Sequence, residues 1–362
     1  MEKLKKLLLW PLIFLVVFAA ISLISVKNRE FGRRFLNIGR YYKGDLFEMA
    51  RLWRFEEKIV PNWDGYENEG LDIKEADIIT MGDSFFEANY ETPPVGYELQ
   101  ELTGKKVYNV NRKDFKASGD NPLVYLDSIN YQKGKAKYLV LEVVERYALD
   151  TSTRYQYTNY KDYAKFSGVV PQANAPKEHT AAIKNFIEPF NLQYFFYNNR
   201  LVAPIYEIGK NFRFEVLGEL DKRTPIYTNN PSMLFYYEDV DFNKTNTEKK
   251  YVDMMAFNIS LLGKILKEKY DLELIYVIMP TKYTVYGKYH EGFKGYNNFI
   301  PSVIDSLKKQ KVNTFDTYSL YTKALDIDKD LLYYSGDTHF TPRGKKMIIN
   351  EIIKLLKEIG GV

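Results

Sequence analysis

Beyond residue 75 the chain alternates short apolar runs, rich in β-branched residues, with longer stretches of helical periodicity. This alternation is typical of a parallel sheet flanked by helices. The runs predicted as strands are 76–81, 106–110, 138–144, 272–279 and 312–315. The stretches predicted as helices are 121–131, 247–270, 300–310 and 342–359. The pattern therefore predicts an α/β fold with a five-stranded parallel sheet, in a domain that spans 74–362.

A stretch at about 148–245 interrupts this alternation and is rich in Tyr, Asn and Pro. It is too long to be a plain loop in a compact domain. We expect it to form a lid or a small inserted subdomain.

The first residues combine positive charge with a long apolar run. Three lysines within the first six residues precede the apolar run 7–24, which at helical rise is long enough to cross about 30 Å of hydrocarbon. We predict a transmembrane signal anchor over 1–26. A cleaved signal peptide is the alternative, although no A-x-A site follows before Lys27. Positive charge on both flanks leaves the orientation undecided.

The segment 27–73 mixes charged and aromatic residues. It is predicted to be helical, either along the membrane surface or as a brace on the domain. No residue of 29–60 is expected to take part in catalysis.

Composition narrows the function classes. A formal charge of +4 with no basic block apart from the N-terminal flanks argues against nucleic-acid binding. The absence of cysteine excludes disulfides, cysteine-ligated zinc and a thiol nucleophile. The 31 Tyr and 23 Phe suit stacking on sugar rings, but they also fit a simple compositional bias.

Ligands of a parallel sheet bind at the carboxyl ends of its strands. Polar residues follow four of the predicted strands, at 82–84, 109–111, 145–147 and 280–282. We expect the functional site among them.

The first of these groups is Gly82-Asp83-Ser84, where a buried strand runs into a tight turn. A serine at such a turn has an exposed hydroxyl, and nearby backbone N–H groups can bind a developing oxyanion. The tripeptide alone is also a common turn, in which Ser84 would be an ordinary helix N-cap.

A second motif, Asp337-Thr338-His339, precedes the last predicted helix. Its spacing lets one short loop hold a carboxylate against one nitrogen of the imidazole. The other nitrogen is then free to act as base toward Ser84. The remaining histidines, His179 and His290, lack an aspartate two residues before them and are expected at the surface.

Together, Gly82-Asp83-Ser84 and Asp337-Thr338-His339 resemble the first and last sequence blocks of the SGNH (GDSL-like) hydrolases. The resemblance covers roughly 74–149 and 246–362. It implies a flavodoxin-like SGNH-hydrolase sheet and a serine enzyme with Ser84, His339 and Asp337 as triad.

The plain esterases of that superfamily have a Gly-x-Asn-Asp block after the third strand, where this chain reads Leu-Glu-Val-Val-Glu-Arg-Tyr at 141–147. This run and Met-Pro-Thr-Lys at 279–282 resemble the branch related to alginate and anchored cell-wall polysaccharide O-acetyltransferases. That likeness implies acyl transfer to a polysaccharide outside the membrane, with a polytopic membrane O-acyltransferase as inferred acyl donor. The alternatives are a carbohydrate O-acetylesterase, a D-alanyl transfer protein of teichoic acid modification, and a polysaccharide-binding or assembly protein with a vestigial triad.

The missing block leaves the oxyanion donors to be assigned. We consider the backbone of Ser84, the backbone of Gly119 and the side chain of Arg146. Gly119 could instead be a hinge, and Arg146 could instead pair with Glu142 or Glu145. Substrate contacts are assigned to Arg146, Tyr147 and Lys282, although a lysine after a strand is usually solvated.

No metal and no bound cofactor are expected. Asp337 and His339 are the only closely spaced candidate ligands at this sheet edge. Neither a glycine-rich phosphate loop nor a dinucleotide fingerprint occurs in the sequence.

Overall fold

The computed structural model describes residues 2–27, 44–46, 49–55, 68, 70–87, 92–167, 202–245, 247–328 and 330–362. Its centre is a five-stranded parallel sheet with the strand order β2-β1-β3-β6-β7. The strands are β1 (Ile78–Met81), β2 (Val107–Asn109), β3 (Tyr138–Val144), β6 (Glu273–Met279) and β7 (Asn313–Thr314). Each lies within a predicted run, so the prediction of a five-stranded parallel α/β sheet is confirmed.

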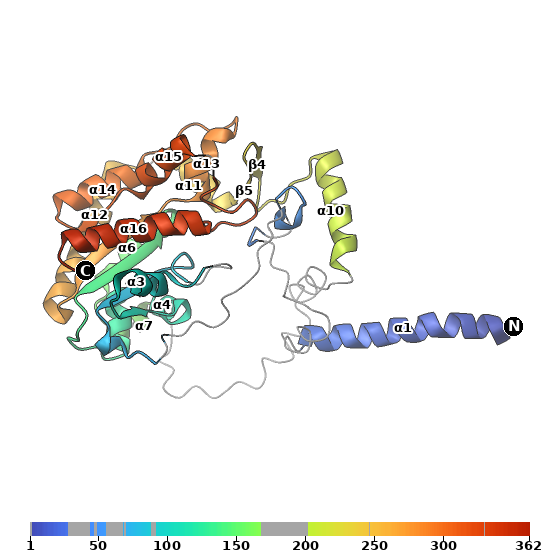
Figure 1. Cartoon of the computed structure of the whole chain (residues 1–362), viewed down its shortest axis with the longest axis horizontal. Coiled ribbons are helices and arrows are strands. Elements are labelled where there is room, and N and C mark those ends of the chain that lie inside the picture. Colours follow the sequence, from blue (N-terminus) through green and yellow to red (C-terminus); the bar gives the residue numbers. More distant parts are fainter. Residues whose placement is uncertain are drawn as a thin grey trace.

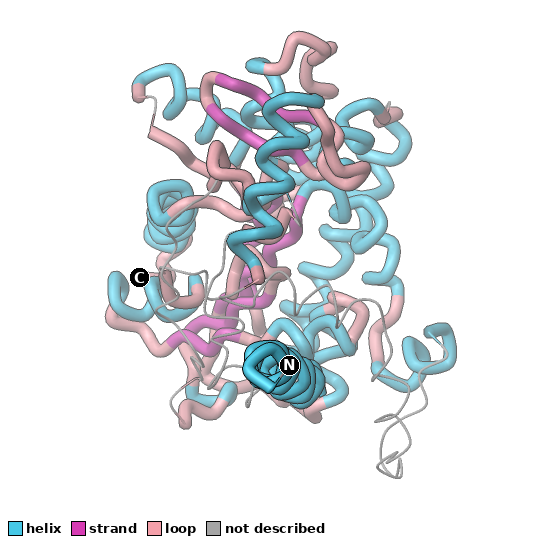
Figure 2. The backbone as a smooth tube through the Cα atoms, turned by 90° about the vertical axis from the view of Figure 1, so that its right-hand side faces the viewer, coloured by secondary structure: helices cyan, strands magenta, loops and turns pink. Residues whose placement is uncertain are grey.

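The central strands β3 and β6 are buried on both faces, which explains their nearly continuous apolar sequences. Successive residues of a strand enter different cores: Ile78 packs on one side of the sheet and Ile79 on the other. Figure 2 shows the strands in a row between helices.

Helices cover both faces of the sheet. The first core contains side chains from α4 (Arg112–Ala117), α5 (Pro122–Ser128), α6 (Glu145–Thr153), α12 (Lys249–Tyr270) and α14 (Phe299–Lys309). The second contains side chains from α3 (Val95–Thr103), α11 (Tyr237–Lys244), α13 (Lys282–Tyr286), α15 (Thr317–Ile327) and α16 (Pro342–Glu358). All four predicted helices are found, as α5, α12, α14 and α16. The last begins where expected, because Thr341 caps its N-terminus and Pro342 takes the first turn.

The region predicted as an insertion contains more regular structure than its sequence indicates. Its start continues α6 into a 3₁₀ turn (Arg154–Gln156) and α7 (Tyr160–Ser167), and residues 168–201 lie outside the described part of the chain. Its end forms α10 (Ala203–Leu217) and a hairpin of β4 (Ile226–Asn229) with β5 (Ser232–Phe235).

The described parts of the segment 27–73 contact this hairpin region. Leu46, Met49 and Phe55 form a small core with Phe214 of α10 and Leu234 of β5. Here the segment forms a 3₁₀ turn (Met49–Arg51), and a second one (Ile73–Glu75) lies just before β1. The rest of the predicted juxtamembrane helix falls on residues 28–43, 47–48, 56–67 and 69, outside the described residues.

The N-terminal prediction is met only in part. Residues Glu2–Lys27 form the helix α1, which lies apart from the sheet in Figure 1. Among the described residues, however, no helix is both long enough and apolar enough to cross a membrane. The transmembrane character of this segment is therefore not confirmed.

Numbered along the chain, the sheet has the order 2-1-3-4-5, the flavodoxin-like doubly wound order. In that order the direction of winding reverses between β1 and β3, and ligands bind at the carboxyl ends of these strands. Ser84 follows β1 at this point.

Candidate active site

We call residues 82–86, directly after β1, the serine loop. Buried polar contacts join it to β3. The Asp83 carboxylate accepts hydrogen bonds from the backbone N–H of Phe85 (2.9 Å) and of Val144 (3.1 Å). The Asp83 N–H donates to Glu142 Oε2 at 2.9 Å. These contacts leave Ser84 exposed at the sheet edge while fixing the backbone on both sides of it.

Gly82 is required by this close approach. A Cβ at this position would lie 2.6 Å from Glu142 Oε2 and 3.0 Å from the side chain of Phe86. Glu142 Oε2 belongs to a buried side chain and accepts from the Asp83 N–H, so moving it aside would break that hydrogen bond. Any side chain at residue 82 would shift the serine loop.

The structure brings Ser84, His339 and Asp337 together although the serine and the histidine are 255 residues apart. Ser84 Oγ lies 2.8 Å from His339 Nε2, and when the imidazole is neutral the serine hydroxyl donates to this nitrogen. His339 Nδ1 donates to Asp337 Oδ1 at 2.6 Å, and Asp337 is fully buried. This is the geometry of a nucleophile, a base and a group that orients the base.

The charges around His339 favour its protonated form. Burial alone would lower the pKa of His339, but the Asp337 carboxylate, its hydrogen bond and the charge of Asp45 outweigh burial and raise the pKa to about 9. An imidazolium that forms when Ser84 loses its proton is therefore stabilised.

Asp45 is a residue at this site that sequence reasoning missed, because the segment 29–60 was expected to contribute nothing to catalysis and the structure places Asp45 beside Asp337 and His339. Asp45 accepts hydrogen bonds from the Thr338 backbone N–H (2.7 Å) and hydroxyl (2.5 Å), and Asp45 Oδ2 lies 3.5 Å from His339 Nδ1. Its own N–H donates to Asp337 Oδ2 at 2.8 Å. Asp45 follows no predicted strand and belongs to no motif, so no local pattern singles it out.

Asp45, Asp337 and His339 could also be considered as a metal site, because their ligand atoms lie within 4.8 Å of one another. However, a cation bound at His339 Nδ1 would force the ring proton onto Nε2. Nε2 could then no longer accept the Ser84 proton. The hydrogen bonds made by these three residues therefore fit a proton-transfer site better than a metal centre.

Lys282 does not occupy the predicted substrate position. It has no exposed surface, and its ammonium group donates to the backbone carbonyls of Tyr334 (3.1 Å), Ser335 (3.0 Å) and Asp337 (2.8 Å). We call residues 335–339 the histidine loop. The buried ammonium group of Lys282 holds this loop through its backbone carbonyls and does not face a ligand.

Arg146 also differs from its predicted roles. It forms an ion pair of 2.8 Å with the buried Asp239 of α11, and its Nε lies 3.7 Å from Glu238. It pairs with neither Glu142 nor Glu145. The guanidinium is thus committed to joining α6 to α11, which argues against a role as oxyanion donor. Tyr147 also bonds to Glu238, but it is 44% exposed and can still contact a ligand.

Glu145 instead joins the ends of β3 and β6. It accepts hydrogen bonds from the Thr281 N–H (3.1 Å), the Thr284 hydroxyl (2.6 Å) and the Tyr296 hydroxyl (2.5 Å). Burial raises the pKa of Glu145 to about 7. Of the polar groups predicted after these two strands, Glu145 and Thr281 bond to each other, and Lys282, Arg146 and Tyr147 bond to other parts of the domain.

Gly119 is a turn residue. Its φ is +68°, its N–H donates to the Lys116 carbonyl at 3.0 Å, and a Cβ here would lie 2.3 Å from the Tyr163 ring. Since its N–H is already used, it is unsuited as an oxyanion donor. Within the described part of the chain the Ser84 N–H has no partner, and Arg146 Nε–H also makes no hydrogen bond, although it lies 3.7 Å from Glu238.

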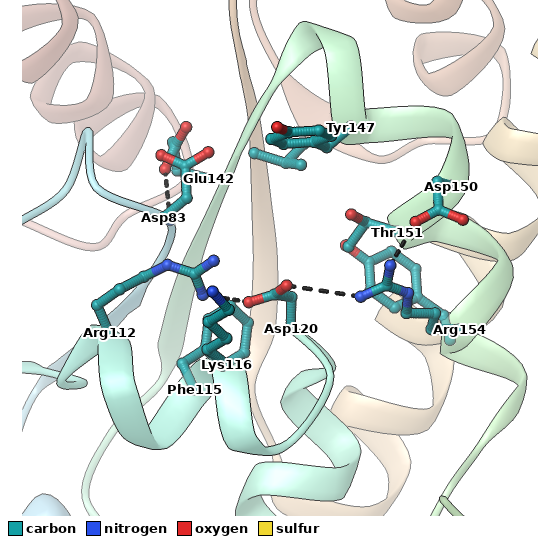
Figure 3. Close-up of a pocket in the computed structure, with 12 residues that line it drawn as sticks. Asp83, Arg112, Phe115, Lys116, Asp120, Glu142, Tyr147, Asp150, Thr151 and Arg154 are labelled. Atoms are coloured by element: carbon teal, nitrogen blue, oxygen red, sulfur yellow. Dashed lines mark hydrogen bonds and ion pairs between the residues drawn. The ribbon is translucent and has the colours of Figure 1, made fainter. Parts of the chain in front are cut away.

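A cavity of about 270 Å³ opens beside the serine loop (Figure 3). It is lined by Asp83 of the serine loop and by charged and aromatic side chains from α4, α6 and their neighbours: Arg112, Phe115, Lys116, Asp120, Tyr147, Asp150, Arg154 and Tyr155. Asp120 lies between two guanidinium groups, bonded to Arg112 and 3.6 Å from Arg154.

Two residues that line this cavity each carry a buried polar atom with no hydrogen-bond partner among the described residues: Glu142 Oε1 and the Tyr155 hydroxyl. Burial and the neighbouring Asp83 raise the pKa of Glu142 well above its usual range, so its carboxyl group can be protonated and can donate. Unpaired buried groups are costly and are normally satisfied by water or a ligand.

Comparison with the models of known protein families, with curated proteins and with solved structures finds no match to this chain. The arguments for function therefore rest on the residues and the geometry described above.

Proposed function

We propose that this chain is a serine acyltransferase of the SGNH type, which moves an acyl group, most simply acetyl, to hydroxyls of an exopolysaccharide or cell-wall polysaccharide. The observation that carries the proposal is the continuous hydrogen-bonded chain from Ser84 Oγ through His339 to the buried Asp337. The flavodoxin-like strand order, with Ser84 at the point where winding reverses, is consistent with it.

In the proposed reaction, Ser84 Oγ attacks the carbonyl carbon of the acyl donor while its proton passes to His339 Nε2. The Ser84 N–H donates to the developing oxyanion. The tetrahedral intermediate expels the donor's leaving group, which takes the proton from His339. An ester on Ser84 remains.

In the second half of the cycle, His339 Nε2 takes a proton from a sugar hydroxyl, whose oxygen attacks the acyl-enzyme. The bond from the acyl carbon to Ser84 breaks, and Ser84 regains its proton. No cofactor is needed for either step.

The cavity beside Asp83 supports a carbohydrate acceptor. Its size suits a ligand smaller than a drug-sized molecule, such as one unit of a polymer. Tyr147 offers an aromatic face, and Asp120, Arg112 and Arg154 offer planar polar groups that can bond to vicinal hydroxyls.

We further propose that the catalytic domain works outside the cell membrane, anchored by the apolar run 7–24, and receives acyl groups from a polytopic membrane O-acyltransferase. The lysine-flanked run within α1 is the support for this placement. Extraction of membranes with alkaline carbonate tests it, because an anchored chain stays in the pellet and a peripheral chain is released.

The nucleophile is tested by labelling the full chain with a fluorophosphonate probe. Wild type should be labelled and should hydrolyse p-nitrophenyl acetate, whereas Ser84→Ala should do neither. Loss of His339 in His339→Ala should slow both reactions by about 10³-fold or more, because triad members act as a unit. An unlabelled wild type would instead favour a binding protein with a vestigial triad, and a labelled Ser84→Ala would exclude Ser84 as nucleophile.

A carbohydrate O-acetylesterase is the second candidate, because the exposed Ser84 leaves water access to the acyl-enzyme. Incubation with p-nitrophenyl acetate and candidate oligosaccharides separates the two by mass spectrometry. Acetylated oligosaccharide supports transfer, while free acetate alone, together with deacetylation of an acetylated polymer, supports the esterase. Transfer of D-alanine from an alanyl thioester to a teichoic acid would support a third candidate, a D-alanyl transfer protein of teichoic acid modification.

A further inference from the structure

We propose that Asp45 is a positioning residue of the triad, so that the segment before the sheet domain completes the active site. This rests on the proposed role of Ser84 and His339, and it goes beyond that role by assigning a second carboxylate to the base. Asp45 lies 292 residues from Asp337 in the sequence and belongs to none of the motifs that suggest the enzyme class.

The hydrogen bonds are reciprocal. Asp45 accepts both the backbone and the hydroxyl donor of Thr338, and its own N–H donates to Asp337 Oδ2. Thr338 stands between the two triad members of the histidine loop. Asp45 therefore restrains the histidine loop at two neighbouring residues, Asp337 and Thr338, directly before His339.

The backbone of the same segment approaches the loop closely. A Cβ on Gly44, whose φ is +109°, would lie 2.1 Å from the Gly336 carbonyl oxygen, and the Leu46 N–H donates to that oxygen at 3.3 Å. A Cβ on Gly336 would in turn lie 2.9 Å from the Phe55 carbonyl oxygen. Two glycines thus allow a contact that no larger residues would permit.

The apolar side chains next to Asp45 hold this segment in place. Leu46, Ala50 and Phe55 are at most 1% exposed and pack with Phe214 and Leu234. In addition, the Leu234 N–H donates to the Ser335 carbonyl at 3.0 Å. The position of Asp45 is therefore defined by a core of its own.

Asp45 also places a second negative charge near the base. The titratable groups that face it are Asp337 and His339 of the histidine loop, and Asp83 adds to the field at His339 from the serine loop. Burial, and then the charge of Asp337, raises the pKa of Asp45 to about 6. At pH 7 and above Asp45 is mostly ionised and adds to the stabilisation of the imidazolium.

The test compares the full chain in detergent with the variants Asp45→Asn and Asp316→Asn, using p-nitrophenyl acetate hydrolysis. Asp316 is a matched control, since it also accepts from a backbone N–H and a hydroxyl (Ser319, 3.0 and 2.6 Å), but it follows the edge strand β7. Asp45→Asn should lower kcat about 10-fold to 100-fold with little change in KM, because His339 loses its position and part of its charge support. Asp316→Asn should keep the wild-type kcat.

The pH profile separates positioning from a merely structural role. Because the charge of Asp45 raises the pKa of His339, the acidic limb of kcat/KM should move to lower pH in Asp45→Asn. A folded Asp45→Asn with wild-type kcat and an unmoved acidic limb overturns the proposal.

If circular dichroism shows that this variant does not fold, Thr338→Val is the deciding variant, since it removes one donor to Asp45. A reduced kcat then supports the proposal, and an unchanged kcat overturns it. Failure of the proposed function itself would be recognised separately, as absence of fluorophosphonate labelling in wild type.

Discussion

The two loops that meet at the active site are held in different ways. The serine loop is attached to the sheet itself, through Asp83 and Glu142 to the central strand β3. The histidine loop is attached to three elements outside the sheet: Lys282 of α13, Leu234 of the β4–β5 hairpin and Asp45 of the N-terminal segment.

This difference indicates how the site is built. The position of the nucleophile follows from the α/β fold, because any chain with this sheet and this turn would place Ser84 there. The position of the base depends on parts added around the fold. We therefore expect substitutions near Ser84 to act locally, and substitutions around His339 to act from several distant places.

The largest effect is expected for Lys282→Met, which breaks the support of the histidine loop. Methionine fills a similar volume but removes the ammonium group that donates to the carbonyls of Tyr334, Ser335 and Asp337. The free energy of unfolding, measured by urea denaturation, should fall by about 1–3 kcal/mol, the cost of leaving buried acceptors unsatisfied. The folded variant should also lose most of its kcat for p-nitrophenyl acetate.

Lys345→Met is the matched control for this prediction. Lys345 is equally buried, but its ammonium group bonds to Thr92 and to the Pro93 carbonyl, not to the histidine loop. It should lose stability and keep the wild-type kcat in its folded fraction. Wild-type kcat in Lys282→Met would show that the histidine loop does not depend on this support.

On the other side of the comparison, Gly82→Ala breaks the attachment of the serine loop. The added Cβ would meet Glu142 and Phe86 and displace the loop, and a misplacement of about 1 Å costs roughly 100-fold in rate. Stopped-flow or steady-state hydrolysis of p-nitrophenyl acetate measures this loss. Gly263→Ala serves as control, since a Cβ there makes ordinary contacts of 3.5 Å with Leu274.

Gly336→Ala sharpens the comparison further. A Cβ on Gly336 would lie 2.9 Å from the Phe55 backbone carbonyl oxygen, on a segment that is not part of the sheet. We expect a loss of kcat similar to that in Gly82→Ala, because the histidine loop would have to shift away from this backbone. A wild-type kcat would contradict the view that the position of the histidine loop depends on the N-terminal segment.

The position of the serine loop could be predicted from the sequence, whereas most contacts that hold the histidine loop could not. Strand runs such as 138–144 are apolar on both faces, so pattern alone located the sheet and therefore Ser84. The Asp337-Thr338-His339 spacing also suggested that the base and its carboxylate share a loop. These predictions depend on local sequence, which periodicity and spacing report.

The supports of the histidine loop could not be predicted in the same way. Asp45 and Lys282 have roles that come from contacts between distant parts of the chain, and nothing in their own neighbourhoods records those contacts. Lys282 illustrates the problem, because a lysine after a strand is usually solvated and here is fully buried. The assignment of Gly119 as an oxyanion donor was wrong for a related reason. The sequence of a glycine turn does not show whether the glycine N–H is already hydrogen-bonded, and here it donates to Lys116.

The pH dependence provides a further, smaller test of the charges around His339. His339 acts as base only when neutral, and its pKa is raised to about 9, chiefly because Asp337 outweighs the effect of burial. Below that pH, kcat/KM should therefore rise about tenfold per pH unit and should level off above it. A plateau that begins near pH 6.5 would show that the carboxylates do not act on His339 as described.

The same shift predicts a stability change of definite sign. Because the folded-state pKa of His339 lies above its unfolded value of about 6.5, the stabilisation is complete below pH 6.5 and is lost as the pH rises through about 9. The Tm of wild type should decrease over this window more than that of His339→Gln. Equal slopes in the two proteins would contradict the assignment.

The smallest effect is expected at the cavity, which borders the serine loop and not the histidine loop. Tyr155→Phe removes a buried hydroxyl that has no partner in the described part of the chain, so the free protein should keep its stability and its hydrolysis of p-nitrophenyl acetate. If an acceptor sugar bonds to this hydroxyl, the KM for the acceptor should rise by roughly 2-fold to 10-fold in the variant. This is the change expected when one ordinary hydrogen bond is lost. Tyr270→Phe is the control, because its hydroxyl is also buried without a described partner but does not line the cavity. An acceptor KM that changes equally in both variants, or in neither, would move acceptor binding away from this cavity and toward the open side of Ser84.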